Sequence, residues 1–277
     1  NYEKDINEVR ANAMKVIVYM NSIIQKYAPG QVGRYNDDFE PRAFGDNITK
    51  WGTSAILIES GGYLNDVEKQ EIRKLNYVSI LSAIYTIANG DYNDIAVEDY
   101  NKIPQNDRKL FNLKIKNLTY ELNGKPYKID LGINRIEVDN RENTDFYNVG
   151  RIVDLGDLST YYGYETFDAE GYKIVAGTLY PTMIASSTSY ERLNALSMLK
   201  KGYAYVKMAK LPDVRYTSKP MTVLKVTKAT PKLNINVGRN PTFLLEKNGT
   251  IEYAVVNGYL INLNGENPNF KNGIIYK

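Results

Sequence analysis

One carboxylate in this chain has the position expected of a catalytic acid or base. Glu59 follows the apolar run Ala55-Ile-Leu-Ile58 and precedes Ser60-Gly-Gly62, which breaks regular structure. A short, partly β-branched apolar run between turn residues predicts a strand that is buried on both faces. Ligands of open α/β sheets bind beyond the carboxyl ends of such strands, and glycines allow a substrate to approach the backbone. Glu59 is therefore a candidate catalytic residue, although a solvated glutamate at the rim of a sheet fits the same spacing.

Two absent residue types limit the chemistry in which Glu59 can take part. The sequence contains no histidine and no cysteine. The first absence excludes histidine acid–base catalysis, Ser-His-Asp triads and histidine-ligated metals within these residues. The second excludes disulfides and thiolate chemistry but is compatible with any cellular compartment.

Composition and charge exclude two classes of partner. The 35 basic and 32 acidic residues leave a formal net charge of +3, too balanced to predict the concentrated basic face of a nucleic-acid-binding protein. No apolar run approaches the roughly 20 residues of a membrane-spanning helix. We therefore expect no nucleic-acid partner and no transmembrane segment. At 43% hydrophobic residues, the chain can bury a core.

Two helical patterns flank the predicted strand. Apolar residues recur three or four positions apart over residues 3–27 and again over residues 66–89, where Gly90 is suited to end the helix. A buried strand between two helices implies a mostly parallel sheet that helices cover. Residues 1–95 are therefore predicted to be an α/β domain.

A long connection, residues 31–50, lies between the first helix and the predicted strand. Loops of this length inside a compact domain are usually functional or disordered, and the aromatic residues Tyr35, Phe39 and Phe44 argue against disorder. Its mixed charges most often form local ion pairs that are worth little individually. The functional interpretation is a wall that lines a pocket above Glu59.

From Leu110 onward, the period of the apolar residues changes from helical to two. Asn123-Gly124 and Asn248-Gly249 each separate two alternating runs, which predicts hairpins with type I′ turns. Further strands are predicted at 133–138, 149–154, 172–179, 203–208 and 221–227, and one helix at 187–200. The predicted fold class is therefore α/β followed by all-β, with residues 106–277 forming a β-rich domain, a sandwich or a half-barrel.

Two stretches carry a resemblance to a known family. They are Arg-Tyr-Asn-Asp-Asp-Phe-Glu-Pro-Arg-Ala-Phe-Gly-Asp-Asn, residues 34–47, and Trp-Gly-Thr-Ser-Ala-Ile-Leu-Ile-Glu-Ser-Gly-Gly, residues 51–62. Together they resemble the end of the catalytic domain of a zinc carboxypeptidase of the carboxypeptidase A type, nearest to bacterial members with extra C-terminal β domains. The resemblance extends over about residues 1–95. It implies a partial zinc-carboxypeptidase-like α/β sheet followed by a β-sandwich-like accessory domain.

The resemblance implies roles for individual residues. A glutamate at the end of a buried strand polarises the zinc-bound water in that family, and Glu59 matches it. A tyrosine on a mobile loop contacts the substrate, and Tyr35, 24 residues before Glu59, matches that tyrosine. The residues between them would shape the pocket for a peptide substrate. The substrate-binding candidates are Arg34, Arg42, Ala43, Phe44 and Asp46.

One departure from the family concerns the metal. The family holds its zinc with a His-x-x-Glu pair and a later histidine, all of them earlier in the fold, and this sequence has no histidine. Water without zinc keeps a pKa of about 15.7 rather than about 7, so Glu59 would have nothing activated to deprotonate. We therefore interpret the chain as the C-terminal part of such an enzyme. Zinc is expected in the full-length protein, and neither bound zinc nor activity is expected of this chain alone.

This interpretation also predicts how the surface of the protein behaves and where in the cell the protein is located. An incomplete sheet leaves strand edges and an apolar face uncovered, which predicts self-association or an exposed apolar patch. Relatives of this kind are mostly exported, so the expected location is extracytoplasmic: periplasmic, surface or secreted.

Two other functions fit the same sequence. The β-rich domain, with Tyr161-Tyr-Gly-Tyr164, is compatible with non-catalytic binding of a glycan or a peptide. Tyrosine rings that lie flat in a groove would favour this binding function, and buried rings would indicate that they only pack in the core. A structural module that docks the peptidase or shields the edge of its sheet is the third possibility.

Overall fold

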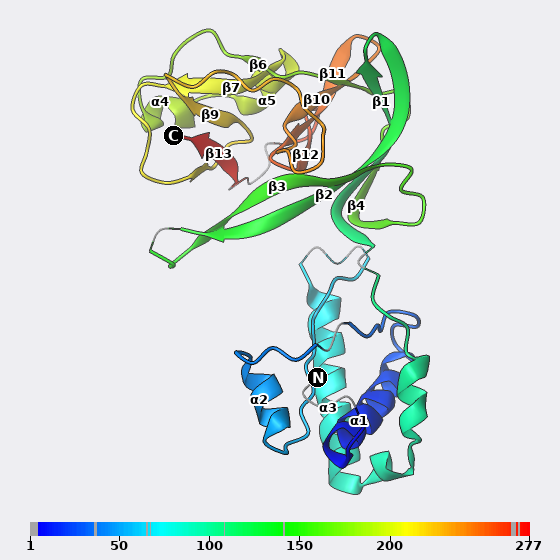
Figure 1. Ribbon diagram of the computed structural model, residues 1–277. Coiled ribbons are helices and arrows are strands. Elements are labelled where there is room, and N and C mark those ends of the chain that lie inside the picture. Colours follow the sequence, from blue (N-terminus) through cyan, green and yellow to red (C-terminus); the bar gives the residue numbers. More distant parts are fainter. Residues whose placement is uncertain are drawn as a thin grey trace. The chain divides into compact units, whose positions relative to one another are not determined.

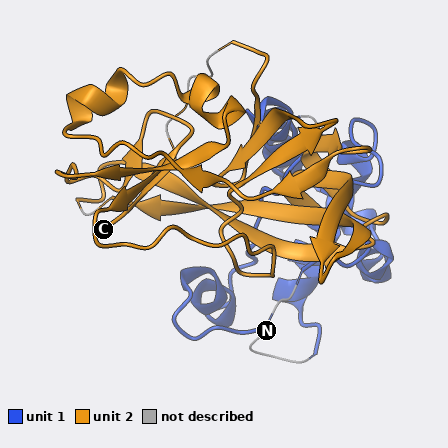
Figure 2. Ribbon diagram, turned by 90° about the horizontal axis from the view of Figure 1, so that it is seen from above, with its two compact units in different colours: residues 1–108 blue, residues 109–277 orange. Residues whose placement is uncertain are grey.

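The computed structural model describes residues 5–35, 38–64, 66, 68–107, 109–140, 142–266, 270 and 272–277. The chain divides into two compact units, unit 1 (residues 1–108) and unit 2 (residues 109–277) (Figure 1, Figure 2). Helices come first along the chain, and two mixed β-sheets of eight and five strands follow. The predicted class, α/β followed by a β-rich part, is confirmed at this level.

Unit 1 is built from helices. Its elements are α1 (Glu8–Ile24), α2 (Phe44–Lys50), α3 (Gln70–Asn89) and the 3-10 helices η1 (Asp91–Asp94) and η2 (Val97–Lys102). The Asn7 side chain caps α1 by accepting the backbone N–H of Arg10 at 3.0 Å. Gly90 ends α3 with a φ of 78°, the left-handed conformation expected at that position. Helices α1 and α3 pack against each other (Figure 1).

The strand predicted at residues 55–58 is wrong for this structure. The segment forms neither helix nor strand, and the Leu57 side chain is 68% exposed. A strand is stable only when other strands pair with its backbone groups, and the described part of unit 1 contains no such strand. The partial carboxypeptidase-like sheet predicted within residues 1–95 is therefore not formed among these residues.

The larger sheet of unit 2 has the strand order β12-β11-β10-β5-β1-β2-β3, and β4 pairs with β1. Its strands are β1 (Leu110–Leu122), β2 (Lys125–Asp139), β3 (Phe146–Gly156), β4 (Tyr162–Asp168), β5 (Lys173–Val175), β10 (Phe243–Lys247), β11 (Thr250–Val256) and β12 (Tyr259–Asn262). The strand predicted separately at 133–138 is the second half of β2, which continues past a bulge.

The predicted hairpin turns are confirmed. Asn123-Gly124 joins β1 to β2 with φ angles of 52° and 74°, and Asn248-Gly249 joins β10 to β11 with 51° and 77°. A third pair, Asn257-Gly258, joins β11 to β12 with 51° and 81°. Positive φ at both central residues is what a type I′ turn requires, and it matches the twist of the flanking strands.

The smaller sheet has the order β6-β7-β9-β13-β8. Its strands are β6 (Thr178–Leu179), β7 (Tyr203–Met208), β8 (Tyr216–Thr217), β9 (Thr222–Lys225) and β13 (Gly273–Tyr276). All neighbours are parallel except β8, which pairs antiparallel with β13. The single helix predicted at 187–200 is two helices, α4 (Ser187–Glu191) and α5 (Ala195–Lys200), because the Asn194 side chain starts a new helix by accepting the N–H of Ser197.

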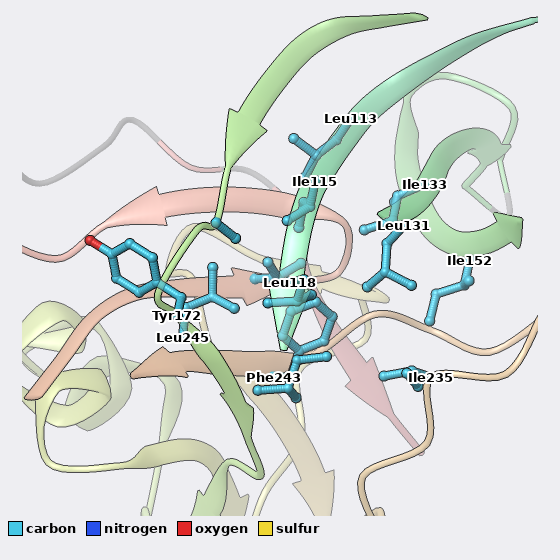
Figure 3. Close-up of a cluster of buried hydrophobic side chains, with 13 residues drawn as sticks. Leu113, Ile115, Leu118, Leu131, Ile133, Ile152, Tyr172, Ile235, Phe243 and Leu245 are labelled. Atoms are coloured by element: carbon cyan, nitrogen blue, oxygen red, sulfur yellow. The ribbon is translucent and has the colours of Figure 1, made fainter. Parts of the chain in front are cut away.

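The two sheets share a hydrophobic core. One buried cluster lines the larger sheet and includes Leu113 and Leu118 of β1 and Leu131 of β2 (Figure 3). A second cluster combines Leu244 of β10 with Leu224 of β9. Because this second cluster contains side chains from both sheets, each sheet needs the other to bury its apolar residues.

Asn257 connects distant segments of unit 2. Its fully buried side chain accepts from the Gly150 N–H and from Nδ2 of Asn240, both at 2.7 Å. Its own Nδ2 donates to the carbonyl oxygens of Asn148 at 2.7 Å and Asn272 at 2.8 Å. A Cβ atom at Gly150 would lie 2.4 Å from the Asn257 carbonyl oxygen, so this approach requires glycine. All four hydrogen-bonding positions of the amide are thus used inside the protein.

Replacing Asn257 by alanine is expected to lower the free energy of unfolding of unit 2 by about 3 kcal/mol. The change removes four hydrogen bonds and leaves buried backbone groups without partners, which costs more than each bond contributes when made. Urea denaturation followed by circular dichroism measures the effect.

Asn123→Ala is the matched control, because Asn123 has the same left-handed backbone in an exposed type I′ turn. The control is expected to lose only about 1 kcal/mol from backbone strain. Equal losses of unfolding free energy in the two variants would show that the hydrogen bonds of the buried Asn257 amide add nothing to the stability that the turn conformation provides.

Candidate functional site

Tyr35 lies within electrostatic reach of Glu59. Burial raises the pKa of the Tyr35 hydroxyl above its ordinary value, and the charges of Glu59, Tyr100 and Asp46 raise it further. Interactions between charges are screened over about 10 Å at moderate ionic strength. Three of the residues predicted from the sequence, Tyr35, Glu59 and Asp46, therefore interact electrostatically.

Arg34 anchors the loop that carries Tyr35. Its Nε donates to the carbonyl oxygen of Ile103 at 2.8 Å, and its Nη1 donates to Oδ1 of Asn101 at 3.0 Å. The guanidinium also lies 5.1 Å from the centre of the Tyr100 ring. These contacts hold the arginine within the fold of unit 1, which gives Arg34 a positioning role beside Tyr35.

The other candidates lie around α2. Arg42 pairs with Glu40 at 2.9 Å between exposed side chains, and such pairs stabilise a fold little. Asp46 accepts the backbone N–H of Glu40 at 3.1 Å. Ala43 directly precedes α2, and Phe44, the first residue of that helix, is 76% exposed. The charges of the loop therefore pair locally, and the Phe44 ring faces solvent.

Two side-chain hydrogen bonds hold the segment that carries Glu59. Ser54 Oγ donates to the carbonyl oxygen of Val9 in α1 at 2.8 Å, and Asn76 of α3 donates to Ser60 Oγ at 2.6 Å. The segment is thus tied to both helices, and the carboxylate of Glu59 is exposed. A carboxylate that water reaches can accept a proton, but only an activated water yields one readily at neutral pH.

The residues around Glu59 do not fit a zinc ion by themselves. A protein zinc site needs three or four nitrogen, sulfur or oxygen ligands. The sequence has no histidine and no cysteine, and the described residues contain no group of three acidic side chains close enough to hold a metal. Tyr35 and Glu59 therefore supply a hydrogen-bond donor and a base without a metal centre.

Two hollows of unit 2 have the size of small-molecule sites. One, of about 490 Å³, lies beside α4, where both carboxylate oxygens of Glu191 accept from Ser218 Oγ at 3.0 and 2.9 Å. The other, of about 500 Å³, lies beside α5 and includes Lys200 and Glu266 in its lining. Neither is lined by a residue singled out from the sequence, and neither combines an acid, a base and a nucleophile in a reactive arrangement.

The tyrosine run of unit 2 does not form a flat platform. The Tyr161 ring stacks on Phe111, with 5.2 Å between the ring centres and 7° between the planes. Tyr162 begins β4 with its side chain exposed, and Tyr164 is half-buried. None of these three rings lines either hollow. The stacking of Tyr161 on Phe111 instead makes its ring part of the packing of unit 2.

Asn101 and Ile103, the residues that hold Arg34 beside Tyr35, were not among the residues predicted from the sequence. Arg34 contacts Asn101 and Ile103 across 67 and 69 residues of chain. Helical or strand periodicity reports only neighbours a few positions apart, so no sequence pattern signals these contacts.

Comparison with protein-family models gives no match, and comparison with curated proteins gives none either. The resemblance therefore rests on residues 34–62 themselves. The described residues contain no helix that is long and apolar enough to cross a membrane.

Removing a negative charge near Tyr35 is expected to lower the pKa of its hydroxyl. Glu59→Gln and Asp46→Asn each remove a charge that opposes ionisation, while burial continues to raise the pKa. NMR titration of ¹³C-labelled tyrosine rings, with Tyr35→Phe to identify the signal, measures the shift. Because the folded-state pKa is raised, this group stabilises the fold below about pH 10, and the contribution disappears as pH rises through the folded-state value.

Glu71→Gln is the control, since Glu71 is exposed in α3 and does not contribute to the raised pKa. An unchanged Tyr35 pKa in the Glu59→Gln protein would mean that the two side chains are not neighbours.

Proposed function

We propose that this chain is the C-terminal part of a zinc-dependent metallocarboxypeptidase, a hydrolase of peptide or amide bonds in peptide substrates. The observation that carries the proposal is the shared environment of Tyr35 and Glu59, which are 24 residues apart in the sequence. These are the two residues to which the resemblance in residues 34–62 assigns chemistry.

The two side chains take complementary roles in this proposal. Glu59 is the general base, because its exposed carboxylate accepts a proton from the attacking water. Tyr35 is a substrate contact, because its exposed phenol hydroxyl can donate a hydrogen bond. Arg34 acts through Tyr35 by fixing the loop from which the hydroxyl projects.

The surface around α2 receives the substrate side chain. Phe44 offers an exposed aromatic ring, and Asp46 lies close enough to influence Tyr35. Ala43 lies between Arg42 and Phe44 in the sequence, and Arg42 adds a positive charge whose pairing with Glu40 is exposed and easily exchanged. An aromatic ring can contact the terminal side chain of a peptide, and nearby charges of both signs can contact its polar groups.

The metal belongs to another part of the proposed protein. The described residues do not fit zinc, so the proposal assigns the zinc ligands to polypeptide that precedes Asn1 in the full-length enzyme. By the same resemblance, we place the enzyme outside the cytoplasm.

A non-catalytic module that binds peptide or glycan, or has a structural role, is the alternative. Both functions are compatible with the lack of a group of potential metal ligands among the described residues, so the extended protein is needed to distinguish them. Under this alternative, Tyr35 and Glu59 interact as the resemblance implies but catalyse no reaction.

The direct test compares this chain with a version extended upstream. We expect bound zinc and peptidase activity in the extended protein and neither in the 277 residues alone. Glu59→Gln in the extended protein is expected to lower kcat at least about a hundredfold, as loss of a general base does, with zinc content unchanged. Elemental analysis and release of the C-terminal residue from a blocked peptide provide the two measurements.

Glu71→Gln in the extended protein controls for loss of an exposed carboxylate in the same unit. Absence of zinc and activity from both lengths would favour the binding module, and full activity in the Glu59→Gln protein would exclude Glu59 as the base.

A further inference from the structure

Residues 200–239 of unit 2 are strongly basic. They contain ten basic residues and one acidic residue, Asp213, whereas the whole chain has a net charge of only +3. All ten basic side chains are exposed or partly exposed. The balanced charge of the chain therefore conceals a positive segment, which includes strands β7, β8 and β9 of the smaller sheet.

The fold brings several of these residues to one edge of the smaller sheet. Strand β9 lies between β7 and β13 and is parallel to both, so the carboxyl ends of the three strands lie at the same edge (Figure 1). Lys225 ends β9 and lies beside Met208, which ends β7. Lys210 follows two residues after β7, and the backbone N–H of Lys228 donates to the carbonyl oxygen of Lys225 at 2.9 Å.

Two further basic residues belong to this edge. The carbonyl oxygen of Arg215 accepts the N–H of Ile275 in β13 at 2.9 Å. Lys277 directly follows β13, and its Nζ lies 3.2 Å from Oδ1 of Asp213. We call the other four cations the basic edge: Lys210, Arg215, Lys225 and Lys228. Within the described part of the chain, no ion pair joins the basic edge to a carboxylate.

Two exposed aliphatic side chains lie among these cations. Val214 precedes Arg215 and is 48% exposed, and Val226 follows Lys225 and is 43% exposed. Basic side chains are attracted to anionic lipid headgroups, and apolar side chains beside them enter the boundary between headgroups and acyl chains. Binding of single-stranded nucleic acid relies instead on aromatic rings that stack on the bases, and valine has no ring.

We propose that the basic edge, together with Val214 and Val226, is a docking surface for a membrane that contains anionic phospholipids. The four cations contact the lipid phosphates, and the two valines enter the interface between them. The bilayer is bound at its surface rather than crossed. This inference goes beyond the proposed function and depends on neither zinc nor catalysis.

The number of cations sets the strength of this attachment. Each lysine or arginine near an anionic surface strengthens binding by about fivefold, so four of them give a preference of several hundredfold over neutral lipid. The attraction is screened over about 10 Å in 0.1 M salt and over about 3 Å in 1 M salt. The proposed attachment is therefore reversible and sensitive to ionic strength.

Sedimentation of this chain with lipid vesicles tests the inference. One set of vesicles contains phosphatidylcholine with about a third of phosphatidylserine, and the other contains phosphatidylcholine alone. We expect binding to the anionic vesicles to be at least about a hundredfold stronger and to disappear in about 1 M sodium chloride. Equal binding to both sets of vesicles, or binding to neither, would overturn the inference.

A pair of double variants locates the surface. Lys225→Gln with Lys228→Gln is expected to weaken binding to the anionic vesicles by about 25-fold. Lys125→Gln with Lys201→Gln is the matched control, because it removes the same charge from two exposed lysines of unit 2 that lie away from this edge. The control is expected to change binding by less than about twofold, since the attraction falls off within a Debye length. Equal losses in the two variants would overturn the inference, because net charge alone would then explain the binding.

The valines distinguish a membrane from a soluble polyanion. Val214→Ser with Val226→Ser is expected to weaken binding to the anionic vesicles by about tenfold, because less apolar surface enters the interface. A DNA oligonucleotide is the probe for a soluble polyanion. Tighter binding of the chain to the oligonucleotide than to the vesicles, with no effect of the valine substitutions on either, would assign the surface to nucleic acid and overturn the inference.

Discussion

The buried amide of Asn257 is the interaction on which the fold of unit 2 depends. It donates to main-chain carbonyls of Asn148 in β3 and of Asn272, next to β13, and so ties the larger sheet to the smaller one. An unpaired amide in this position would cost more than any one of its hydrogen bonds contributes. The segments must therefore meet in one arrangement, and the apolar cluster that draws side chains from both sheets is a second connection between them.

Unit 1 has no comparable polar centre among its described residues, and its apolar surface is distributed differently. Helices α1 and α3 pack together, with Ser82 and Thr86 of α3 buried and Leu75 and Val78 partly buried, while other large apolar side chains of α3 are exposed. Among the described residues, the backbone of residues 55–58 makes no hydrogen bond, and several large apolar side chains of α3 are exposed.

The candidate site lies in unit 1. Arg34, next to Tyr35 in the sequence, is held by contacts with Asn101 and Ile103, whereas two serine hydroxyls tie the segment of Glu59 to α1 and α3. The proposed substrate contact therefore lies beside a residue with several side-chain contacts, and the proposed base lies on an exposed segment.

Features that depend on neighbours along the chain could be predicted from the sequence. The Asn-Gly turns, the helical periods of α1 and α3 and the change to a period of two after Leu110 all follow from local backbone preferences, and the structure has them. Other features depend on contacts between distant parts of the chain. Lys114 alternates with apolar residues as an exposed lysine would, yet it is buried, because Nζ donates to the distant carbonyl oxygens of Leu158 and Tyr161. Residues 55–58 have the composition of a buried strand but form none, because a strand exists only through partners that local sequence does not specify.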